Sequence, residues 1–282
     1  MMVTGKALLA GVMGWPIGHS RSPLLHGYWL NQYGIDGAYV PLAVPPDRIE
    51  QALRALPALG FRGCNVTVPH KEAVFRLVDR LDDSARRIGA VNTVLVLPDG
   101  SLEGRNTDGY GFWQSLQAGA PAGWDVGSGA AVVLGAGGAA RAVAVALLDA
   151  GAPGIRLLNR TRARAEELAS DLADPRLQVL DWEDRAEALQ GAALLVNTTT
   201  QGMQGQPPLQ IDLSSLPGTA LVTDIVYTPL ITPLLQAALD RGNAIVDGLG
   251  MLLHQARPGF HAWFGTDPQV TDDLRRHVLG LA

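Results

Sequence analysis

The residues best suited to chemistry stand in a glycine-rich turn between an apolar strand and an alanine-rich helix. Gly135, Gly137 and Ala140 have the spacing G-x-G-x-x-A, directly after the apolar run Ala131–Leu134. Small residues at this spacing let the backbone turn tightly and approach a pyrophosphate. The helix that follows offers free N–H groups and the positive end of its dipole. Glycine-rich turns are often only turns, but the strand before and the helix running on to Asp149 favour a dinucleotide site.

The end of the next apolar strand, Ile155–Leu158, indicates which dinucleotide binds. An NAD-binding unit carries Asp or Glu about 20 residues after its glycines, where the carboxylate binds the ribose 2′-hydroxyl. At 21 positions after Gly138, this chain has Asn159 instead, followed by Arg160 and Thr161. A carboxylate would repel a 2′-phosphate, whereas the fork of donors on an arginine binds one. Arg160 therefore predicts NADP.

The alternative for this segment is a solvated helix start. In that case Thr161 caps the helix, and the neighbouring arginines, Arg162 and Arg164 among them, pair with Glu166 and Glu167. We favour the phosphate interpretation because Arg160 stands at the strand end rather than out on the helix.

The composition excludes several classes of protein. Of the 282 residues, 47% are hydrophobic and 17% are charged, and the net charge of −5 includes no basic block of the kind that binds nucleic acid. No apolar run reaches the ~18 residues of a membrane span. The single cysteine, Cys64, excludes an internal disulfide framework and fits a reducing compartment. The run Ala7–Trp15 loosely imitates a signal peptide, but it leads into Pro16 without a clear cleavage site, so we expect a cytoplasmic protein.

The length and rhythm of the chain predict an α/β protein of two domains, with mostly parallel strand pairing. From residue 131 the rhythm is that of a doubly wound, Rossmann-type sheet. We expect strands near residues 7–13, 38–43, 63–68, 91–97, 131–134, 155–158, 178–180, 194–196 and 221–225. We expect helices near residues 23–32, 47–56, 71–78, 83–88, 112–117, 251–256 and 259–264.

A polar loop after the first strand carries two serines. Ser20 and Ser22 place hydroxyls at the start of a predicted helix, with Pro23 at its first position and Ser22 as its N-cap. Such a helix start suits a small carboxylate. An ordinary Ser-Pro helix cap explains the same residues equally well.

Other polar side chains stand at predicted strand ends, where open α/β sheets place ligands. Thr67 and Lys71 follow one strand, although a lone lysine opening a helix is usually a surface residue, and we expect His70 to be a packing or hydrogen-bonding residue. Asn92 begins a strand and Asp108 lies in a glycine-flanked turn, so each singly is explained by turn chemistry. Further polar or glycine-rich strand ends are residues 197–200, 224–227 and 247–251.

Together these motifs resemble the shikimate dehydrogenase family. The resemblance runs from about Gly11 to about Phe264, in family order, through G-W-P-I-G-H-S-R-S-P, N-V-T-V-P-H-K, G-A-V-N-T, N-T-D-G, G-A-G-G-A, N-R-T and D-G-L-G-M. The departures are few. Gly27 stands where many members have Asn, and Arg257-Pro258-Gly259 stands where many have an Ala-rich helix.

The resemblance implies one domain that binds the substrate, one that binds the cofactor, and a set of site residues. Residues 1–108, completed by helices of residues 248–282, would be the substrate domain, and residues 109–247 an NADP-binding Rossmann domain. The substrate carboxylate would be bound by Ser20, Ser22 and Tyr227, and the ring hydroxyls by Thr67, Asn92, Asp108 and Gln255. Lys71, paired with Asp108, would transfer the proton. The cofactor would be bound by Gly135, Ala136, Gly137, Gly138, Ala139, Asn159, Arg160, Thr161, Arg164, Ile225, Gly248 and Asp83.

The implied reaction is the reversible, NADPH-dependent reduction of 3-dehydroshikimate to shikimate in chorismate and aromatic amino-acid biosynthesis. A protonated Lys71 would supply both a positive charge and a proton to the developing alkoxide. Cofactor and substrate on separate domains imply closure across a cleft. The reaction requires no metal, and the sequence is compatible with a monomer or a homodimer that binds neither nucleic acid nor membrane.

Two alternatives remain open. A quinate/shikimate dehydrogenase of the same superfamily would use a broader range of substrates or NAD, which kinetics with quinate and NAD would reveal, and Arg160 argues against a preference for NAD. A catalytically silent NADP-binding sensor could be built on the same fold. The presence of both Lys71 and Asp108 argues against the sensor, and an assay with shikimate and NADP distinguishes it.

Overall fold

The computed structural model describes residues 3–281, and its chain groups into two compact units. Unit 1 contains the residues up to Thr107 together with those from Leu252 onward, and unit 2 contains Asp108–Met251. Each unit is built on its own six-stranded sheet. The α/β class and the two sheets agree with the sequence prediction.

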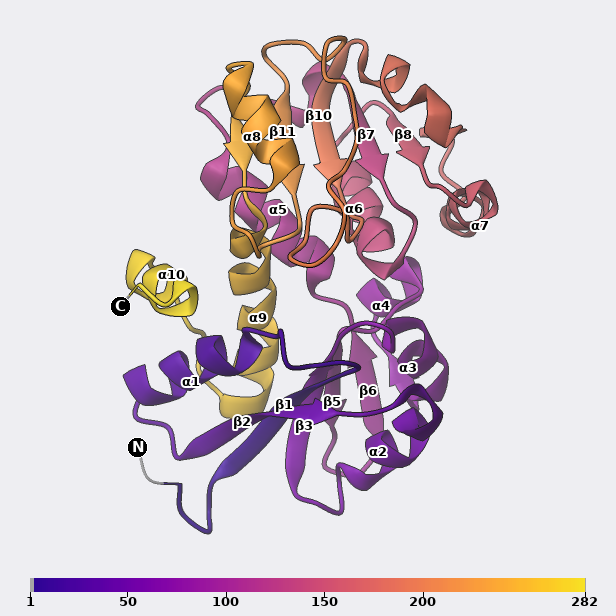
Figure 1. The fold of residues 1–282 in the computed structure, drawn as a ribbon. Helices are drawn as coiled ribbons and strands as arrows, with labels where there is room; N and C mark the ends of the chain where they lie inside the picture. Colours follow the sequence, from indigo (N-terminus) through magenta and orange to yellow (C-terminus); the bar gives the residue numbers. More distant parts are fainter. Residues whose placement is uncertain (1–2, 282) are drawn as a thin grey trace. The chain divides into compact units, whose positions relative to one another are not determined.

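Unit 2 is a doubly wound parallel sheet (Figure 1). Its strands lie in the order β12-β11-β10-β7-β8-β9, and every neighbouring pair is parallel. The chain order therefore reverses between β7 and β10, which is the position where open sheets bind ligands. The strands are β7 (Ala130–Leu134), β8 (Ile155–Leu158), β9 (Leu177–Leu180), β10 (Ala192–Asn197), β11 (Leu221–Asp224) and β12 (Ile245–Val246).

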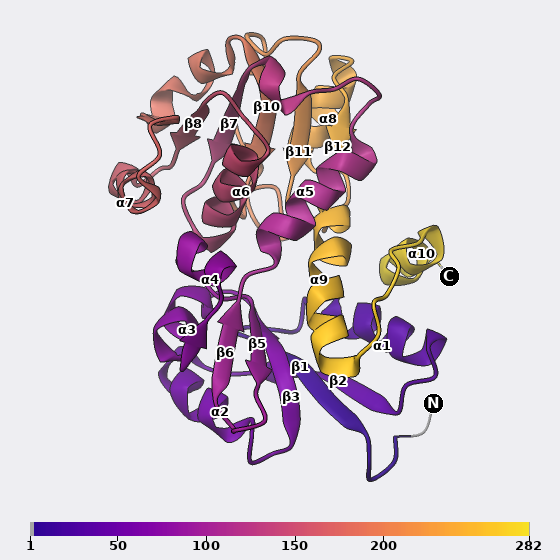
Figure 2. The same ribbon diagram turned by 180° about the vertical axis from the view of Figure 1, so that it is seen from behind.

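Helices cover both faces of this sheet. The helices are α5 (Asp108–Gly119), α6 (Gly138–Asp149), α7 (Arg162–Leu172) and α8 (Pro233–Asp240), with short 3-10 turns at residues 126–128, 182–185 and 187–189. Both views show α5 and α6 on one face and α8 on the other (Figures 1 and 2). Alternate residues of β7 pack to opposite sides, Val133 with α5 and α6, Val132 with α8. Because both faces are buried, the strand is apolar throughout, as parallel strands usually are.

Unit 1 has a mixed sheet in the order β2-β1-β3-β5-β6-β4. Its strands are β1 (Leu8–Gly14), β2 (Gly37–Ala43), β3 (Phe61–Val66), β4 (Arg80–Leu81), β5 (Thr93–Val96) and β6 (Leu102–Arg105). Its helices are α1 (Ser22–Gln32), α2 (Ile49–Ala55), α3 (Lys71–Leu77), α4 (Asp83–Ile88) and α10 (Asp272–Leu279), with a 3-10 turn at residues 46–48. Helix α9 (Gly248–Phe264) begins in unit 2 and ends in unit 1.

The prediction of mostly parallel pairing holds in unit 1 except at β5. This strand is antiparallel to both β3 and β6. Its connection to β6 is a tight hairpin in which Gly100 has a φ of +81°, and Leu97 N–H donates to Ser101 O at 2.9 Å. A turn this short can join only antiparallel strands. The short β6 itself, like β4 and β12, was not among the predicted strands.

Three local predictions were wrong. Asp108 is not in a turn but is the first residue of α5. Arg21, not Ser22, stands at the N-cap of α1, and Ser22 is already helical. The two helices expected around Pro258 are one continuous helix, because buried side chains anchor the segment before and after the missing backbone donor, Leu253 before it and Phe260 after it.

Two residues of β3 and its neighbourhood allow a test of the close packing in unit 1. Gly63 has a φ of +148°, and a Cβ there would lie 2.0 Å from Val94 O and 2.4 Å from Trp263 Nε1. Gly60 also has a positive φ, +76°, but a Cβ there would meet nothing within 4 Å.

We therefore expect Gly63→Ala to lower the free energy of unfolding by about 3 kcal/mol or more, because backbone and a buried indole must both move. Gly60→Ala adds only left-handed strain, about 1 kcal/mol. Thermal unfolding followed by circular dichroism compares the two variants. Equal losses in melting temperature would contradict the tight fit at Gly63.

Candidate functional site

The predicted cofactor residues of unit 2 gather at one edge of its sheet. Since all six strands are parallel, their carboxyl ends meet at this edge. Loops leave it after β7 (residues 135–137), β8 (159–161), β10 (from 198), β11 (225–232) and β12 (residue 247). Of the predicted cofactor residues, only Asp83 lies elsewhere, on α4 of unit 1, where it is exposed and pairs with Arg86 at 2.9 Å.

The glycines of the loop after β7 differ in what requires them. Gly135 has a φ of +113°, and a Cβ there would lie 2.5 Å from Thr198 Oγ1, so the fold itself requires glycine. Gly137 caps α6 with a φ of −94°, which any residue adopts, and a Cβ there would meet no atom within 4 Å. The open space over Gly137 is what the close approach of a pyrophosphate needs. The loop therefore fits a dinucleotide.

The arginines after β8 were predicted either to bind a phosphate or to pair with carboxylates at a helix start, and their ion pairs distinguish these two interpretations. Arg162 pairs with Asp181 at 2.7 Å and with Glu166 at 2.8 Å, and these partners raise the pKa of its guanidinium. The helix-start interpretation is therefore right for Arg162. Arg160 and Arg164 are exposed and pair with no carboxylate among residues 3–281. Two unpaired guanidinium groups, that of Arg160 just after β8 and that of Arg164 in the first turn of α7, suit the 2′-phosphate of NADP.

A buried carboxylate ties the next two loops together. Asp224 and Asn197 are register partners at the ends of β11 and β10, and Asn197 Nδ2 donates to Asp224 Oδ1 at 3.0 Å. The same oxygen accepts from Val226 N–H at 3.0 Å, while Thr232 Oγ1 donates to Asp224 Oδ2 at 2.7 Å. Asp224 thus holds both ends of the segment that carries Ile225 and Tyr227. Burial raises its pKa to about 6, against the effect of these three hydrogen bonds.

Gly248 packs directly on this segment. A Cβ at Gly248 would lie 2.5 Å from the carbonyl of Ile225 and 2.6 Å from Val226 O. The structure therefore brings together Ile225 and Gly248, two of the residues that the resemblance places at the cofactor.

In unit 1 the polar motifs also reach a common edge. The segments after β1 and β3 leave the sheet side by side, and Thr67 N–H donates to Met13 O at 2.9 Å. Asn92 joins them because β5 is reversed, so the residue before β5 lies beside the end of β3, where Val66 N–H donates to Asn92 O at 2.7 Å. If β5 ran parallel to β3, Asn92 would lie at the opposite edge of the sheet, because it precedes its strand.

Asn92 is held in a buried hydrogen-bond network with Thr107 and Gln255. Thr107 N–H donates to Asn92 Oδ1 at 2.9 Å, and Asn92 Nδ2 donates to Thr107 Oγ1 at 3.0 Å and to Gln255 Oε1 at 3.3 Å. Thr107 Oγ1 in turn donates to Gln255 O at 2.8 Å. Two residues predicted to bind ring hydroxyls, 163 positions apart in the sequence, are thus in contact.

The serine loop offers neutral hydroxyls and no free arginine. Ser20 Oγ accepts the backbone N–H of Ser22 at 3.3 Å, so Ser20 satisfies the helix start that Ser22 was expected to cap. Arg21, which lies between them, donates to Val278 O on α10. A carboxylate at this loop would therefore be bound by hydroxyls and by the start of α1.

Lys71 is the first residue of α3 and follows the end of β3 by a short turn. The adjacent His70 is buried, and its Nε2 lies 2.8 Å from Val44 O, so it is a packing and hydrogen-bonding residue as expected. Cys64 is fully buried, and burial raises the pKa of its thiol to about 12. Lys71 is the residue of this segment that was predicted to transfer the proton.

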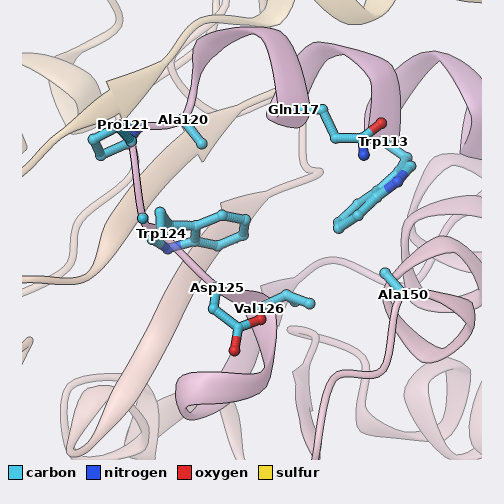
Figure 3. A pocket seen from close by; sticks show the side chains of 10 residues that line it. Trp113, Gln117, Ala120, Pro121, Trp124, Asp125, Val126 and Ala150 are labelled. Carbon is cyan, nitrogen blue, oxygen red and sulfur yellow. The ribbon is translucent and has the colours of Figure 1, made fainter.

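A hollow of unit 2 lies at the other edge of its sheet. It has a volume of about 430 Å³ and is lined by Trp113 from α5, by Trp124 and Val126 before β7, and by Ala150 after α6 (Figure 3). Trp124 Nε1 donates to Ala193 O near the start of β10. The strands begin at this edge, so the hollow is separate from the loops that fit a dinucleotide.

Two further properties concern the whole described chain. Among residues 3–281, no group of three or more His, Cys, Asp or Glu side chains could hold a metal ion. No helix in the same range is long and apolar enough to cross a membrane.

Sequence reasoning missed two residues that position the site. Asn65 and Asp224 are both buried, and each links segments far apart in the sequence. Both residues were visible only as members of strand-end motifs, with no role assigned to either. Polar residues inside an apolar strand are the one signal that could have drawn attention to them.

The fold and the two polar edges define a dinucleotide-binding α/β protein of the two-domain dehydrogenase class. Residues 12–94 match the model of the shikimate dehydrogenase substrate binding domain, and residues 122–204 match that of shikimate / quinate 5-dehydrogenase. Shikimate dehydrogenase (NADP(+)) of Paramagnetospirillum magneticum is 65% identical over 98% of this chain and 100% of its own. The chain belongs to the shikimate dehydrogenase family.

Solved structures agree with this assignment. Shikimate 5-dehydrogenase from Thermus thermophilus, in complex with NADP(H) and shikimate, has a TM-score of 0.86 at 36% identity and covers 98% of this chain and 100% of its own. Quinate dehydrogenase from Corynebacterium glutamicum, in complex with NAD, has a TM-score of 0.88 at 32% identity, with 98% and 99% covered.

The unpaired state of Arg160 generates a prediction about cofactor choice. Arg160→Ala should raise the KM for NADP by roughly ten- to a hundredfold and leave the KM for NAD almost unchanged, because a phosphate–arginine contact contributes about 1.5–3 kcal/mol. Arg162→Ala is the matched control, since its guanidinium is already paired, and it should change neither KM. Steady-state kinetics with both cofactors makes the comparison. Equal effects on NADP and NAD would show that Arg160 is structural.

The buried carboxylate generates a prediction about pH. The folded pKa of Asp224 is raised to about 6, so the native state binds this proton more tightly than the unfolded chain does. The protonated Asp224 therefore stabilises the folded state fully at a pH below the unfolded pKa. This stabilisation, about 3 kcal/mol, is lost as the pH rises through the unfolded pKa and then through about 6.

Asp224→Asn removes this loss, so the melting temperature of the variant relative to wild type should rise between pH 4.5 and 7.5. Asp212→Asn is the control, because Ser214 lowers the pKa of this exposed carboxyl, so its contribution to stability is present above the unfolded pKa and is lost only at lower pH. Its difference in melting temperature from wild type should therefore stay nearly constant between pH 4.5 and 7.5. A pH-independent difference for Asp224→Asn would mean that the carboxyl is not desolvated.

Proposed function

We propose that this chain is an NADP-dependent shikimate dehydrogenase that reversibly reduces 3-dehydroshikimate to shikimate, a step of chorismate and aromatic amino-acid biosynthesis. The observation that carries the proposal is the polar edge of unit 1, where Lys71 follows β3 and Asn92, bonded to Thr107 and Gln255, lies beside the end of the same strand. Hydrogen-bonding side chains suit a polyhydroxylated ring, and a lysine suits proton transfer to a carbonyl oxygen.

The cofactor is proposed to bind along the carboxyl edge of unit 2. The segment Gly135–Ala139 and the start of α6 would hold the pyrophosphate, Arg160 and Arg164 the 2′-phosphate, and Ile225 and Gly248 the nicotinamide. When bound as NADPH, the cofactor supplies the hydride. The protein residues bind and orient the two reactants, and they supply the proton.

Lys71 is proposed as the acid in the reducing direction and the base in the reverse direction. Its ammonium group stabilises negative charge on the ketone oxygen and donates a proton to it, which leaves a neutral amine and an alcohol. Only two of the 22 basic residues are lysines, Lys6 and Lys71, and arginine cannot perform this step because it does not release its proton. Asp108, buried at the start of α5, is proposed as the acidic member of the catalytic pair.

The substrate carboxylate is proposed to be bound by the hydroxyls of Ser20, Ser22 and Tyr227. Arg21 is engaged with Val278, so no arginine of this loop competes for the anion. Thr67 is the remaining residue proposed at the ring. We also propose that the protein acts in the cytoplasm, alone or as a homodimer.

The alternative, a quinate/shikimate dehydrogenase of broader specificity, is not favoured. The relative at 65% identity carries the NADP-dependent shikimate name, whereas the quinate dehydrogenase that uses NAD is 32% identical. The unpaired Arg160 also supports NADP. Kinetics with quinate and NAD beside shikimate and NADP decides between the two activities.

Lys71→Ala tests the proposed mechanism in the same assay. Turnover of shikimate, followed by the absorbance of NADPH, should fall by roughly two to four decades, because one acid–base group is lost. The Kd of shikimate by calorimetry should change little. Lys71→Arg should be as inactive as Lys71→Ala, and Lys6→Ala, the only other lysine, should be fully active. Near-normal turnover of Lys71→Ala would show that Lys71 is only the opening residue of a helix.

A further inference from the structure

A buried asparagine at the centre of the unit 2 sheet joins the loop after β10 to the end of β11. Asn197 is the last residue of β10, which lies between β7 and β11 (Figure 1), and it is fully buried. Its Nδ2 donates to Asp224 Oδ1 at 3.0 Å and to Gln201 O at 3.1 Å. Its Oδ1 accepts from Thr199 N–H at 3.0 Å and from Thr199 Oγ1 at 2.8 Å. The side chain thus makes all four hydrogen bonds of which an amide is capable.

The orientation of this amide is determined by its neighbours. The backbone N–H of Thr199 can only donate, so it must face Oδ1, and the carbonyl of Gln201 can only accept, so it must face Nδ2. The second N–H of Asn197 then points at the Asp224 carboxylate, and a hydrogen bond to a charged acceptor is stronger than one to a neutral acceptor. A reversed amide would lose its bonds to both backbone groups.

The loop after β11 is bound by Asn197 and by its carboxylate partner. The backbone carbonyl of Asn197 accepts from Ile225 N–H at 3.1 Å. Asp224 Oδ1, which the amide of Asn197 binds, accepts from Val226 N–H at 3.0 Å. Two successive N–H groups of the loop that carries Tyr227 are therefore held by this pair.

The glycine turn after β7 is held by a different contact. Thr198 donates to Leu134 O at the end of β7, from its backbone N–H at 2.8 Å and from its Oγ1 at 2.7 Å. The same Oγ1 would lie 2.5 Å from a Cβ at Gly135, so Thr198 packs on the glycine turn. Thr198 thus connects β10 to the segment proposed at the pyrophosphate, and Asn197 connects β10 to the segment proposed at the nicotinamide. The two sets of hydrogen bonds share no atom.

We propose that Asn197 is a positioning residue that fixes the nicotinamide loop, residues 225–232, relative to the glycine turn before the cofactor binds. The inference rests on the proposed binding of NADP along this edge and deepens it. Asn197 touches neither the cofactor nor the substrate in this role, because its side chain is buried and fully engaged. It acts through Asp224 and through the backbone of Ile225.

Positioning in advance matters because NADP spans both segments. A cofactor held at the glycine turn meets the nicotinamide loop as a second binding site for the same molecule. Ordering that loop during binding would cost affinity, whereas a loop that is already ordered makes no such demand. Removal of Asn197 should therefore weaken the binding of the nicotinamide half of the cofactor and spare the adenosine half.

The decisive comparison is between NADP and 2′,5′-ADP, which retains the adenosine with its two phosphates and lacks the nicotinamide. In Asn197→Ala the Kd of NADP, measured by calorimetry, should rise about tenfold, the effect of one lost hydrogen bond. The Kd of 2′,5′-ADP should stay nearly unchanged, because Thr198 still holds the glycine turn. Equal rises for both ligands, or no rise for NADP, would overturn the proposal.

Asn243→Ala is the matched control for the loss of a buried amide. Asn243 belongs to the same unit and is buried, and its Nδ2 donates to Pro217 O at 2.8 Å and to Ala220 O at 3.0 Å. It precedes β12, so it lies at the edge where the strands begin. This variant should lower the melting temperature and leave both Kd values unchanged. A rise in the Kd of NADP equal to that in Asn197→Ala would show general loosening of unit 2.

A double-mutant cycle tests the path through Asp224. Asn197 and Asp224 act through one hydrogen bond, so Asp224→Ala should raise the Kd of NADP clearly less in an Asn197→Ala background than in the wild-type protein. Full additivity would overturn this path. Wild-type protein that binds neither NADP nor 2′,5′-ADP would instead overturn the proposed cofactor site, and the role of Asn197 with it.

A measurement on the unaltered protein covers the case in which these variants do not fold. In ¹⁵N relaxation without cofactor, the order parameters of Ile225 and Val226 should equal those of the neighbouring strands, about 0.85. Saturation with NADP should leave them unchanged. Clearly lower values that NADP restores would show that the cofactor, rather than Asn197, orders the nicotinamide loop.

Discussion

The reversed direction of β5 governs the polar edge of unit 1. In a fully parallel sheet, residues before a strand and residues after it lie at opposite edges. Because β5 runs against β3 and β6, Asn92 lies beside the ends of these strands, within reach of Thr107 and Gln255. The Gly100 turn that reverses the chain therefore matters to a site at the far end of the strand. Unit 2 needs no such reversal, since its loops all follow strands of one direction.

Burial explains why the polar residues beneath both edges are so well connected. Asn65, Asn92 and Asp224 lie inside their units, where an unpaired polar atom costs about 1–3 kcal/mol. Each is therefore satisfied by several partners, and these partners come from more than one strand or loop. The same requirement that stabilises the interior also sets the distances between loops that carry the proposed ligand residues.

Much of this arrangement could be predicted from the sequence. The two α/β units, the strand–turn–helix at Gly135, and the rule that polar residues follow strands all depend on local patterns. The direction of β5 depends on a hairpin whose strands are only four residues long, too short to show a clear period. The continuity of α9 through Pro258 depends on aromatic packing from other elements. The partners of Asn65 and Asp224 come from distant segments, which no single stretch of sequence displays.

Unit 1 is assembled from both ends of the described chain, whereas unit 2 is one continuous segment. Helix α1 packs against α10, and Trp29 Nε1 donates to Gln269 O across 240 positions of sequence. During synthesis, the first hundred residues therefore leave the ribosome without the partners that complete their core. Unit 2 has all of its strands once residue 251 is made, so it can fold before the C-terminal part of unit 1 has been synthesised. The segment that is translated first thus belongs to the unit that is completed last, and until the C-terminal residues are made Trp29 lacks Phe260 and Tyr39 lacks Trp263.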